Sequence, residues 1–473
     1  METFDFLVIG GGSAGLSAAV GAAKFGLKVG LVEKGQLGGD CLWTGCVPSK
    51  SLIHSAKIAH TLDNAKDYGF YDVGYNTMFK DVIKRVWDVI HSIERNDSPE
   101  TVKSKGVTPI FGEASFVSKN MIEAGGKRYK AKKFLIAAGS RAFIPPIKGI
   151  ENIEYLTNEN LFHLQALPKS LIVAGGGPIG VEMAQAFLRL GSEVIVVHSG
   201  PNLLNREDDD VAQELQKILK SEGLKVITNS RVEEVERDGI RKVVYVTDKT
   251  SKKKTKVTAS ALLVATGRVK NLDLNLEAAG VVYDPKGGIK VDKFMRTSAK
   301  HIYAAGDCTD CPYMFTHVAD YHAGIAVGHA LFKLRRKADY TALPWVTFTD
   351  PELARVGLSE KECVDKGIKY KAYRVDFKDV DRAEAEGETR GFMKTLVSPK
   401  GKILGAHILG VNGGELLGEM TLAISQGVSI TKLASVIHAY PTLSRVVRKV
   451  SGQYLSDQLE QKPWIKRVAK WLF

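Results

Sequence analysis

One pattern occurs twice in the chain and limits what it can fold into. In its first copy an apolar run over residues 6–9 leads into Gly10-Gly11-Gly12-Ser13-Ala14-Gly15, a helix rich in small residues is expected over 16–25, and a strand over 28–32 ends at Glu33. In such a unit the first glycine of GxGxxG makes a tight turn, the second lets the backbone approach a pyrophosphate, and the third allows close packing of helix on strand. The unit therefore predicts dinucleotide binding, through Gly10, Gly12, Gly15 and the ribose-binding carboxylate of Glu33.

The second copy has the same order of elements. A strand over 171–174 precedes Gly175-Gly176-Gly177-Pro178-Ile179-Gly180, and a helix over 181–190 and a strand over 193–197 follow. Two complete units indicate two bound dinucleotides, or one duplication with a silent copy.

The second copy ends in His198 and Ser199, where an NAD-specific site usually has Asp or Glu. An acid would repel a 2′-phosphate, so its absence permits NADP, yet no arginine stands at that point to bind the phosphate. Arg206 and His198 are candidate contacts, and Gly180 as third glycine is typical of NAD sites. The sequence leaves the choice between NAD and NADP open.

Two cysteines lie just after the first unit. Cys41 and Cys46 stand in Gly38-Gly39-Asp40-Cys41-Leu42-Trp43-Thr44-Gly45-Cys46-Val47-Pro48-Ser49-Lys50. A zinc site would usually need further Cys or His ligands at short spacing, and none flank this pair. Two unrelated buried thiols are the other alternative. Their place beside a nucleotide loop predicts a redox-active disulfide.

Composition narrows the class of protein. The chain has 473 residues, 44% of them hydrophobic and 25% charged, which suits about three globular domains. No apolar run approaches the length of a membrane span, and residues 1–5 are too short and acidic for a signal peptide. Five cysteines are too few for a disulfide scaffold, and a cycling pair suits a reducing compartment, so we expect a cytoplasmic enzyme.

The net charge of +13 is expected to be dispersed over the surface, partly at a hairpin tip around 252–256. No nucleic-acid-binding motif is present in the sequence.

Further motifs appear in a fixed order along the chain. They are Ala265-Thr266-Gly267-Arg268, then Ile302-Tyr303-Ala304-Ala305-Gly306-Asp307, then Pro344-Trp345-Val346-Thr347-Phe348-Thr349-Asp350-Pro351-Glu352. With the cysteine segment, they resemble almost end to end the FAD-dependent pyridine nucleotide–disulfide oxidoreductases, which include dihydrolipoamide dehydrogenase, glutathione reductase and mercuric reductase.

The resemblance implies an α/β fold with two Rossmann-like dinucleotide-binding domains and an α+β C-terminal dimerisation domain. Residues 1–147 and 270–338 are expected to bind FAD, residues 148–269 to bind NAD(P)H, and residues 339–473 to form a homodimer.

The same resemblance implies the residues of the cofactor sites, and no metal site. For FAD they are Gly10, Gly12, Ser13, Ala14, Gly15, Glu33, Lys34, Gly39, Asp40, Lys50, Ala114, Gly139, Asp307, Phe315, Thr316 and His317. For NAD(P) they are Gly175, Gly177, Ile179, Gly180, His198 and Gly267.

The resemblance also implies the roles at the disulfide. Cys46 is expected next to the flavin as the charge-transfer thiolate, and Cys41 faces the substrate as the interchange thiol. Lys50 is expected near the flavin N5, paired with Glu182. The alternative for Glu182 is a surface helix charge.

The chain departs from the family where its usual His-Pro-Thr and following Glu supply a base from the partner subunit. Tyr440 stands at the His position and Arg445 at the Glu position. Tyrosine titrates near 10 and is a poor base at neutral pH. His438 is interpreted as a structural or interface residue, and Arg445 as a group that lowers a thiol pKa or binds an anionic substrate.

Mercuric reductases also carry Tyr there, and Gly306-Asp307-Cys308-Thr309-Asp310 resembles them. The last cysteine is Cys363, however, so their C-terminal cysteine pair, which delivers the metal, is missing. Cys308 and Cys311 form a CxxC, either a second thiol or metal pair or, as we favour, two small buried loop residues.

The segment 462–473 combines Trp464, Val468 and Leu472 on one helical face with basic residues elsewhere. This pattern is typical of a membrane-surface or partner-binding helix, while packing on the chain's own dimer is the alternative.

The sequence therefore predicts an NAD(P)H-dependent FAD enzyme with Tyr440 at its active site and a Cys41–Cys46 disulfide that passes electrons to a disulfide, quinone or metal acceptor. The alternatives are dihydrolipoamide dehydrogenase, a mercuric or other metal reductase, and a membrane-docked electron-transfer subunit at the inner membrane face.

Overall fold

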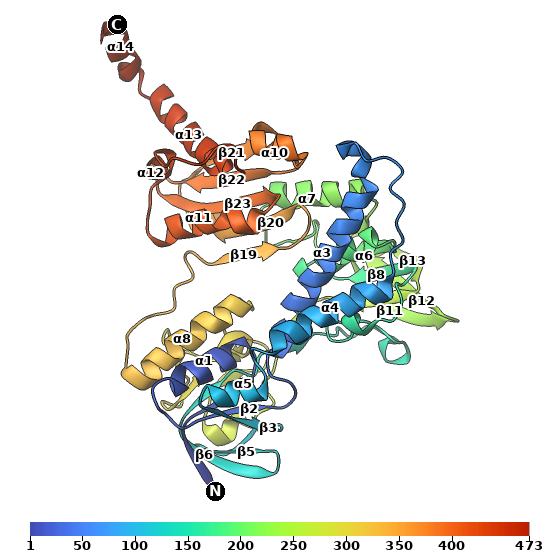
Figure 1. Cartoon of the computed structure of the whole chain (residues 1–473), viewed down its shortest axis with the longest axis vertical. Coiled ribbons are helices and arrows are strands. Elements are labelled where there is room, and N and C mark those ends of the chain that lie inside the picture. The colour runs from blue at the N-terminus through green and yellow to red at the C-terminus, as the bar shows by residue number, and fades with distance from the viewer. Residues whose placement is uncertain (473) are drawn as a thin grey trace. The chain divides into compact units, whose positions relative to one another are not determined.

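The computed structural model describes residues 1–472, which fall into two compact units (Figure 1). The first comprises Met1–Pro168 and Ala261–Ala338, and the second comprises Lys169–Ser260 and the chain from Asp339 onward. The finer three-domain division expected from the sequence stays a prediction.

The first unit is built on a mostly parallel seven-stranded sheet. Its order is β3 (Val107–Phe111), β2 (Val29–Glu33), β1 (Glu2–Ile9), β6 (Lys127–Ile136), β5 (Met121–Ala124) and β4 (Ser115–Ser118), with β18 (Ile302–Ala304) paired to β6. β4 and β5 form an antiparallel extension. Leu7 and Val8 of β1 are both fully buried, as expected for a parallel sheet covered on both faces.

Two helices cover one face of this sheet. α1 (Ser13–Ala23) and α8 (Thr316–Phe332) lie side by side in Figure 1 and share one apolar core with β1 and β2. The alanines and glycines of α1 allow this close approach. The remaining elements of the unit are α2 (Gly39–Trp43), α3 (Cys46–Asp63), α4 (Phe79–Glu94), α5 (Pro99–Ser104), β7 (Ser140–Ala142), β14 (Ala261–Val264), β15 (Arg268–Lys270), β16 (Tyr283–Asp284) and β17 (Gly288–Ile289), with short 3-10 helices between them.

The second unit begins with a smaller βαβ arrangement. β8 (Ser170–Ala174), β9 (Glu193–Val197) and β10 (Lys225–Ile227) pair in parallel, with α6 (Pro178–Arg189) and α7 (Asp209–Ser221) between them in the chain. A three-stranded antiparallel sheet follows, formed by β11 (Ser230–Asp238), β12 (Arg241–Asp248) and β13 (Lys254–Ala259).

The C-terminal part of the second unit is an antiparallel sheet packed against helices. Its strand order is β19 (Pro344–Thr347), β20 (Glu352–Gly357), β23 (Ile403–Gly410), β22 (Phe392–Val397) and β21 (Lys371–Asp376). Its helices are α9 (Glu360–Asp365), α10 (Asp381–Glu386), α11 (Gly413–Ser425), α12 (Ile430–Ala434), α13 (Arg445–Glu460) and α14 (Pro463–Leu472). The expected fold class, two strand–turn–helix units and an α+β C-terminal domain, is confirmed.

Two helices begin earlier than expected. α1 starts at Ser13 and α6 at Pro178, inside the glycine-rich turns rather than after them. The first N–H groups of a helix have no acceptor within it, so glycine and proline are tolerated in the first turn. The turns and the helix N-termini are therefore one structure.

Within residues 1–472, no helix is both long and apolar enough to cross a membrane.

Candidate active site and nucleotide-binding turns

The first glycine-rich turn joins β1 to α1. The N–H of Gly10 donates to the carbonyl of Val32 at 2.8 Å, and its φ of +106° favours glycine. A Cβ on Gly15 would overlap the carbonyl oxygen of Gly10, whereas one on Gly12 would meet only the Cα of Gly39, at 3.7 Å. Gly15 thus packs closely against the backbone of Gly10, while the space beside Gly12, in front of the helix N-terminus, stays open. This arrangement can hold a pyrophosphate.

Glu33 is fixed at the end of β2 by two backbone amides. Its Oε2 accepts from the N–H of Gly11 at 2.6 Å and its Oε1 from that of Gly35 at 2.8 Å. Lys34 beside it is exposed. This carboxylate and the open turn fit the adenosine half of a dinucleotide such as FAD.

Asp307 lies in a 3-10 helix over Gly306–Cys308 that follows β18. Burial raises the pKa of its carboxyl group, and Ser140 Oγ donates to it at 2.5 Å. Arg268 lies 4.0 Å from this carboxylate and pairs with Asp40 at 2.9 Å, while Asn158 donates to Asp40 at 3.1 Å. The structure thus gathers two predicted residues, Asp40 and Asp307, around Arg268.

The sequence reasoning missed Ser140, Asn158 and Arg268. Arg268 belongs to the Ala265–Arg268 motif, which was the one signal available for it.

The other predicted FAD residues lie in the same unit. Phe315, Thr316 and His317 are at the start of α8, where the Phe315 and His317 rings stack with centroids 5.3 Å apart. Ser13 Oγ, at the start of α1, donates to the Thr316 carbonyl at 3.3 Å, so the two helix starts meet. Ala14 is buried in α1, Gly39 and Asp40 begin α2, Ala114 lies between β3 and β4, and Gly139 follows β6 with φ +68°.

The second turn repeats the first. The N–H of Gly175 donates to the carbonyl of Val197 at 2.9 Å, its φ is +121°, and a Cβ on Gly180 would overlap the carbonyl oxygen of Gly175. A Cβ on Gly177 would meet nothing within 4 Å among the described residues, and Ile179 in the first turn of α6 is exposed. The turn therefore has the shape needed for a second dinucleotide, NAD(P)H. Gly267, the other predicted contact, lies in the first unit between β14 and β15.

Cys41 and Cys46 are brought together by a short helix and a glycine. Cys41 is in α2, and Gly45 ends that turn so that Cys46 becomes the first residue of α3. Pro48 fits the first turn of α3 because its missing N–H has no acceptor there. Both residues are thiols that hydrogen-bond to each other.

The pKa values of the two thiols are shifted in opposite directions. The hydrogen bond from Cys41, then Thr316 and Lys50, lower the pKa of Cys46 to about 6. The same hydrogen bond, followed by burial, raises the pKa of Cys41. The N-terminus of α3 also favours negative charge on Cys46. At neutral pH the pair therefore carries one charge, on the sulfur predicted to face the flavin.

Glu182 is not a surface charge, so that alternative is wrong. It lies in α6, only 4% exposed, and its Oε1 accepts from the N–H of Phe348 at 2.8 Å. Its pairing with Lys50 stays a prediction.

Tyr440 is 67% exposed, and a hydrogen bond with Asp381 raises the pKa of its hydroxyl. The Arg445 guanidinium lies 5.7 Å from the centre of the Tyr440 ring. Neither group supplies a base at neutral pH.

His438 cannot take the place of that base in this arrangement. Its Nε2 lies 3.0 Å from Oε1 of Glu419 and its Nδ1 lies 3.2 Å from the carbonyl of Val436, so both ring nitrogens are engaged. Its side chain is 5% exposed, which supports the structural interpretation.

The second cysteine pair is buried. Burial raises the pKa of Cys308 to about 11, and its Sγ lies within hydrogen-bonding reach of the Ala305 carbonyl. Lys270 donates to the carbonyl of Cys311 at 3.2 Å. These contacts favour packed loop residues over a second reactive pair. Cys363 is likewise buried in α9.

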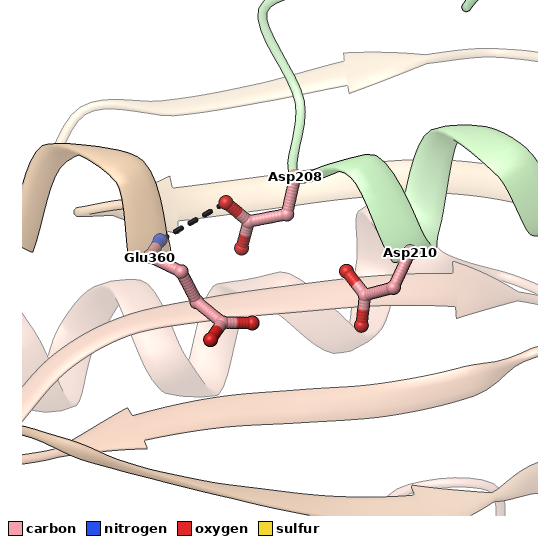
Figure 2. A group of neighbouring side chains, drawn as sticks. All are labelled: Asp208, Asp210 and Glu360. Atoms are coloured by element: carbon pink, nitrogen blue, oxygen red, sulfur yellow. Dashed lines mark hydrogen bonds between the residues drawn. The ribbon is translucent and has the colours of Figure 1, made fainter. Parts of the chain in front are cut away.

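Three carboxylates gather in the second unit, those of Asp208, Asp210 and Glu360 (Figure 2). Lys394 lies among them with its Nζ 3.0 Å from Asp208, 2.5 Å from Asp210 and 2.7 Å from Glu360. A side chain of the protein itself therefore supplies one positive charge against the three carboxylates.

Comparison with known proteins gives consistent matches along the chain. Residues 4–323 match the family described as pyridine nucleotide-disulphide oxidoreductase, and residues 343–450 match its dimerisation domain. A mercuric reductase of Bacillus cereus is 35% identical over 93% of this chain and 70% of its own length, and a dihydrolipoyl dehydrogenase of Chlamydia pneumoniae is 33% identical over 94% and 95%.

Solved structures match over nearly the whole chain. The Cu(II) complex of the HOCl-induced flavoprotein disulfide reductase RclA from Escherichia coli has a TM-score of 0.87 and 28% identity, covering 96% of this chain and 100% of that one. LpdA from Mycobacterium tuberculosis has a TM-score of 0.87 and 27% identity over the same shares.

Proposed function

The chain belongs to the pyridine nucleotide-disulphide oxidoreductase family and is an FAD-dependent enzyme that uses NAD(P)H, and on this basis we propose that its electron acceptor is a thiophilic metal ion such as Cu(II) or Hg(II). In each of its two glycine-rich turns the last glycine, Gly15 or Gly180, has no room for a Cβ, and the middle glycine, Gly12 or Gly177, has free space beside it. Both turns therefore fit a dinucleotide. FAD, when bound, supplies the two-electron carrier between nicotinamide and the Cys41–Cys46 disulfide.

The residues of the first unit prepare the dithiol for this role. Thr316 and Lys50 favour the thiolate on Cys46, while Cys41 keeps its proton until an electrophile arrives. A thiophilic cation binds thiolates directly and displaces the remaining proton to water. The dithiol then gives its two electrons to one Hg(II), or to two Cu(II) ions in turn, and returns to the Cys41–Cys46 disulfide. This route needs no dedicated base.

The observation that carries the proposal is Tyr440, exposed and with its pKa raised by Asp381. Cleavage of a substrate disulfide leaves a thiolate that must be protonated, and oxidation of a dithiol needs a base. A hydroxyl that titrates above its usual value near 10 cannot act as that base at neutral pH. A metal acceptor removes this requirement, and relatives of the chain include mercuric reductases and a neighbour solved with Cu(II).

The test measures steady-state NAD(P)H oxidation by the purified holoenzyme with Cu(II), Hg(II), lipoamide, glutathione disulfide and a quinone. We expect kcat/KM to be highest for a metal ion, and Cys41→Ser and Cys46→Ser to lower it by about 100-fold or more. Cys311→Ser, a cysteine of the same unit outside the pair, is the control. A higher kcat/KM for lipoamide or the quinone would overturn the proposal.

The C-terminal helix carries a second proposal, a cytoplasmic enzyme that contacts the inner membrane face. On α14 the apolar side chains of Trp464, Val468, Trp471 and Leu472 are 61%, 44%, 83% and 66% exposed, and Arg467 and Lys470 are exposed too. Trp residues at the interface and basic groups facing anionic headgroups are the chemistry of a peripheral membrane helix.

Sedimentation with phosphatidylserine-containing vesicles tests this contact, with pure phosphatidylcholine vesicles as the comparison. We expect the full chain to sediment with the anionic vesicles, and Trp464→Ala with Trp471→Ala to remain in solution. Leu334→Ala, a change at an exposed residue elsewhere, is the control. Equal binding by the double variant and the full chain would show that α14 does not contact lipid.

A further inference from the structure

His198 takes, in the second nucleotide turn, the place that Glu33 takes in the first. In the first turn the N–H of Gly11 donates to Oε2 of Glu33 at 2.6 Å, and in the second the N–H of Gly176 donates to Nδ1 of His198 at 3.2 Å. Each residue follows the buried part of its strand and fixes the middle of its turn. The two turns therefore share the same backbone hydrogen bond. They differ in the side chain at the ribose position, which is an anionic carboxylate in the first turn and an imidazole in the second.

The hydrogen bond to Nδ1 decides the tautomer of His198. A nitrogen that accepts carries no proton, so the proton of the neutral ring is on Nε2. Burial, then the charge of Lys249, lower the pKa of His198, so the ring is neutral at physiological pH. Where Glu33 offers a second accepting oxygen, His198 offers an N–H donor.

That donor lacks a hydrogen-bond partner among residues 1–472, although it is buried. A buried polar group without a partner costs free energy, and its presence points to a ligand. Residue 200, in the loop over the ring, is glycine, and a Cβ there would lie 2.8 Å from Nε2. Glycine at 200 leaves out the Cβ that would press on the ring nitrogen, so the backbone of this loop lies over the buried donor.

Lys249 adds a positive charge at the same loop. It is exposed at the end of β12, and its Nζ donates to the carbonyl of Ser199, the residue after His198, at 3.1 Å. Residues 199–205 contain no carboxylate. This loop therefore presents an ammonium group and an imidazole N–H, while the carboxylate of Asp209 in α7 accepts from Asn202 at 3.2 Å.

We propose that His198 and Lys249 bind the 2′-phosphate of NADPH, and that the enzyme prefers NADPH to NADH. A carboxylate in this position accepts from a ribose hydroxyl and repels a phosphate. An N–H donor and a cation do the reverse, because both make charge-assisted hydrogen bonds to phosphate oxygens. The preference concerns the electron donor and is independent of the acceptor.

Calorimetric titration of the FAD-loaded protein with NADP⁺, NAD⁺, 2′,5′-ADP and 5′-AMP tests the proposal without turnover. We expect the wild type to bind 2′,5′-ADP more tightly than 5′-AMP. In Lys249→Met the affinity for 2′,5′-ADP should fall about tenfold, while the affinity for 5′-AMP should stay the same. Lys256→Met, which removes one exposed charge from the neighbouring strand β13, is the matched control and is expected to change neither.

His198→Glu recreates the arrangement of Glu33 and is expected to reverse the preference, so that NAD⁺ binds more tightly than NADP⁺. Lys249→Glu tests the same reversal at an exposed turn if the buried variant does not fold. Anaerobic rates of flavin reduction by NADPH and NADH provide a second readout. Tighter binding of NAD⁺ by the wild type, or an unchanged ratio of the two adenosine phosphates in Lys249→Met, would overturn the proposal.

Discussion

Sγ of Cys46 lies 3.3 Å from Oγ1 of Thr316, although 270 residues separate them in the chain. Cys46 begins α3 and Thr316 begins α8, so two helix N-termini meet at one sulfur. When the sulfur is ionised only the hydroxyl can donate, and the contact then becomes a charge-assisted hydrogen bond. Thr316 is thus part of the reason that the pKa of Cys46 is about 6.

Thr316→Val should raise the pKa of Cys46 by about one pH unit, since a hydrogen bond to a charged group contributes roughly 1.5 kcal/mol. Because the folded protein lowers this pKa to about 6, the thiolate is present above pH 6 and lost below it. The measurement is the pH dependence of the charge-transfer absorbance of the two-electron-reduced enzyme. Thr61→Val, farther along α3, is the control and should leave the midpoint in place. An unshifted midpoint in Thr316→Val would show that the Thr316 hydroxyl does not lower the pKa of Cys46.

Tyr440→His combined with Arg445→Glu should create dihydrolipoamide dehydrogenase activity. The pair would restore a base that titrates near neutrality and a carboxylate to orient it, a contribution of about 100-fold or more. NAD(P)⁺ reduction by dihydrolipoamide at neutral pH is the measurement, and Tyr440→Phe, which removes only the hydroxyl, is the comparison. Brisk dihydrolipoamide oxidation by the wild type would show that the chain has a base elsewhere.

Local patterns explain why the nucleotide units could be predicted from the sequence. The turn at Gly10 and the close approach at Gly15 depend on residues within a few positions of each other, and the same holds for Gly175 and Gly180. Glu33 could be predicted because the length of the intervening helix and strand fixes where the second strand ends.

Contacts between distant segments explain what the sequence could not predict. Nothing near Arg268 indicates that it pairs with Asp40, because β7 and β15 must first fold together. The acceptor role of His198 Nδ1 needs the turn itself to be built. The resemblance to a family indicated Thr316 as a flavin contact, but its hydrogen bond to Cys46 comes only from three-dimensional structure.

Arg189→Met should destabilise the second unit by about 3 kcal/mol or more. Arg189 is buried, with its guanidinium 2.7 Å from Glu222 and 2.7 Å from Asp350. Its removal leaves two buried carboxylates with the partly exposed Arg390, 2.8 Å from Glu222 and 4.0 Å from Asp350, as their remaining cation. Urea unfolding followed by tryptophan fluorescence measures the loss. Arg382→Met breaks an exposed i,i+4 pair with Glu386 and should cost less than about 0.5 kcal/mol. Equal losses of unfolding free energy in the two variants would mean that the buried ion pairs of Arg189 stabilise the protein no more than an exposed pair does.

Lys394 determines whether the carboxylates of Asp208, Asp210 and Glu360 bind metal ions. Its side chain is 3% exposed and its ammonium contacts all three, so in the wild type a divalent cation would have to displace it. Millimolar Mg²⁺ or Ca²⁺, or their removal by a chelator, should therefore leave the Tm of the wild type unchanged.

In Lys394→Met the three carboxylates repel one another without a counter-charge, so the Tm should fall, and Ca²⁺ should restore part of it because clustered oxygens are the ligands it prefers. Thermal unfolding with and without Ca²⁺ measures both effects. Lys378→Met, at an exposed residue of the same domain, should show neither. A Tm that rises with Ca²⁺ in the wild type would instead make the acidic cluster a metal site, with Lys394 displaced on binding.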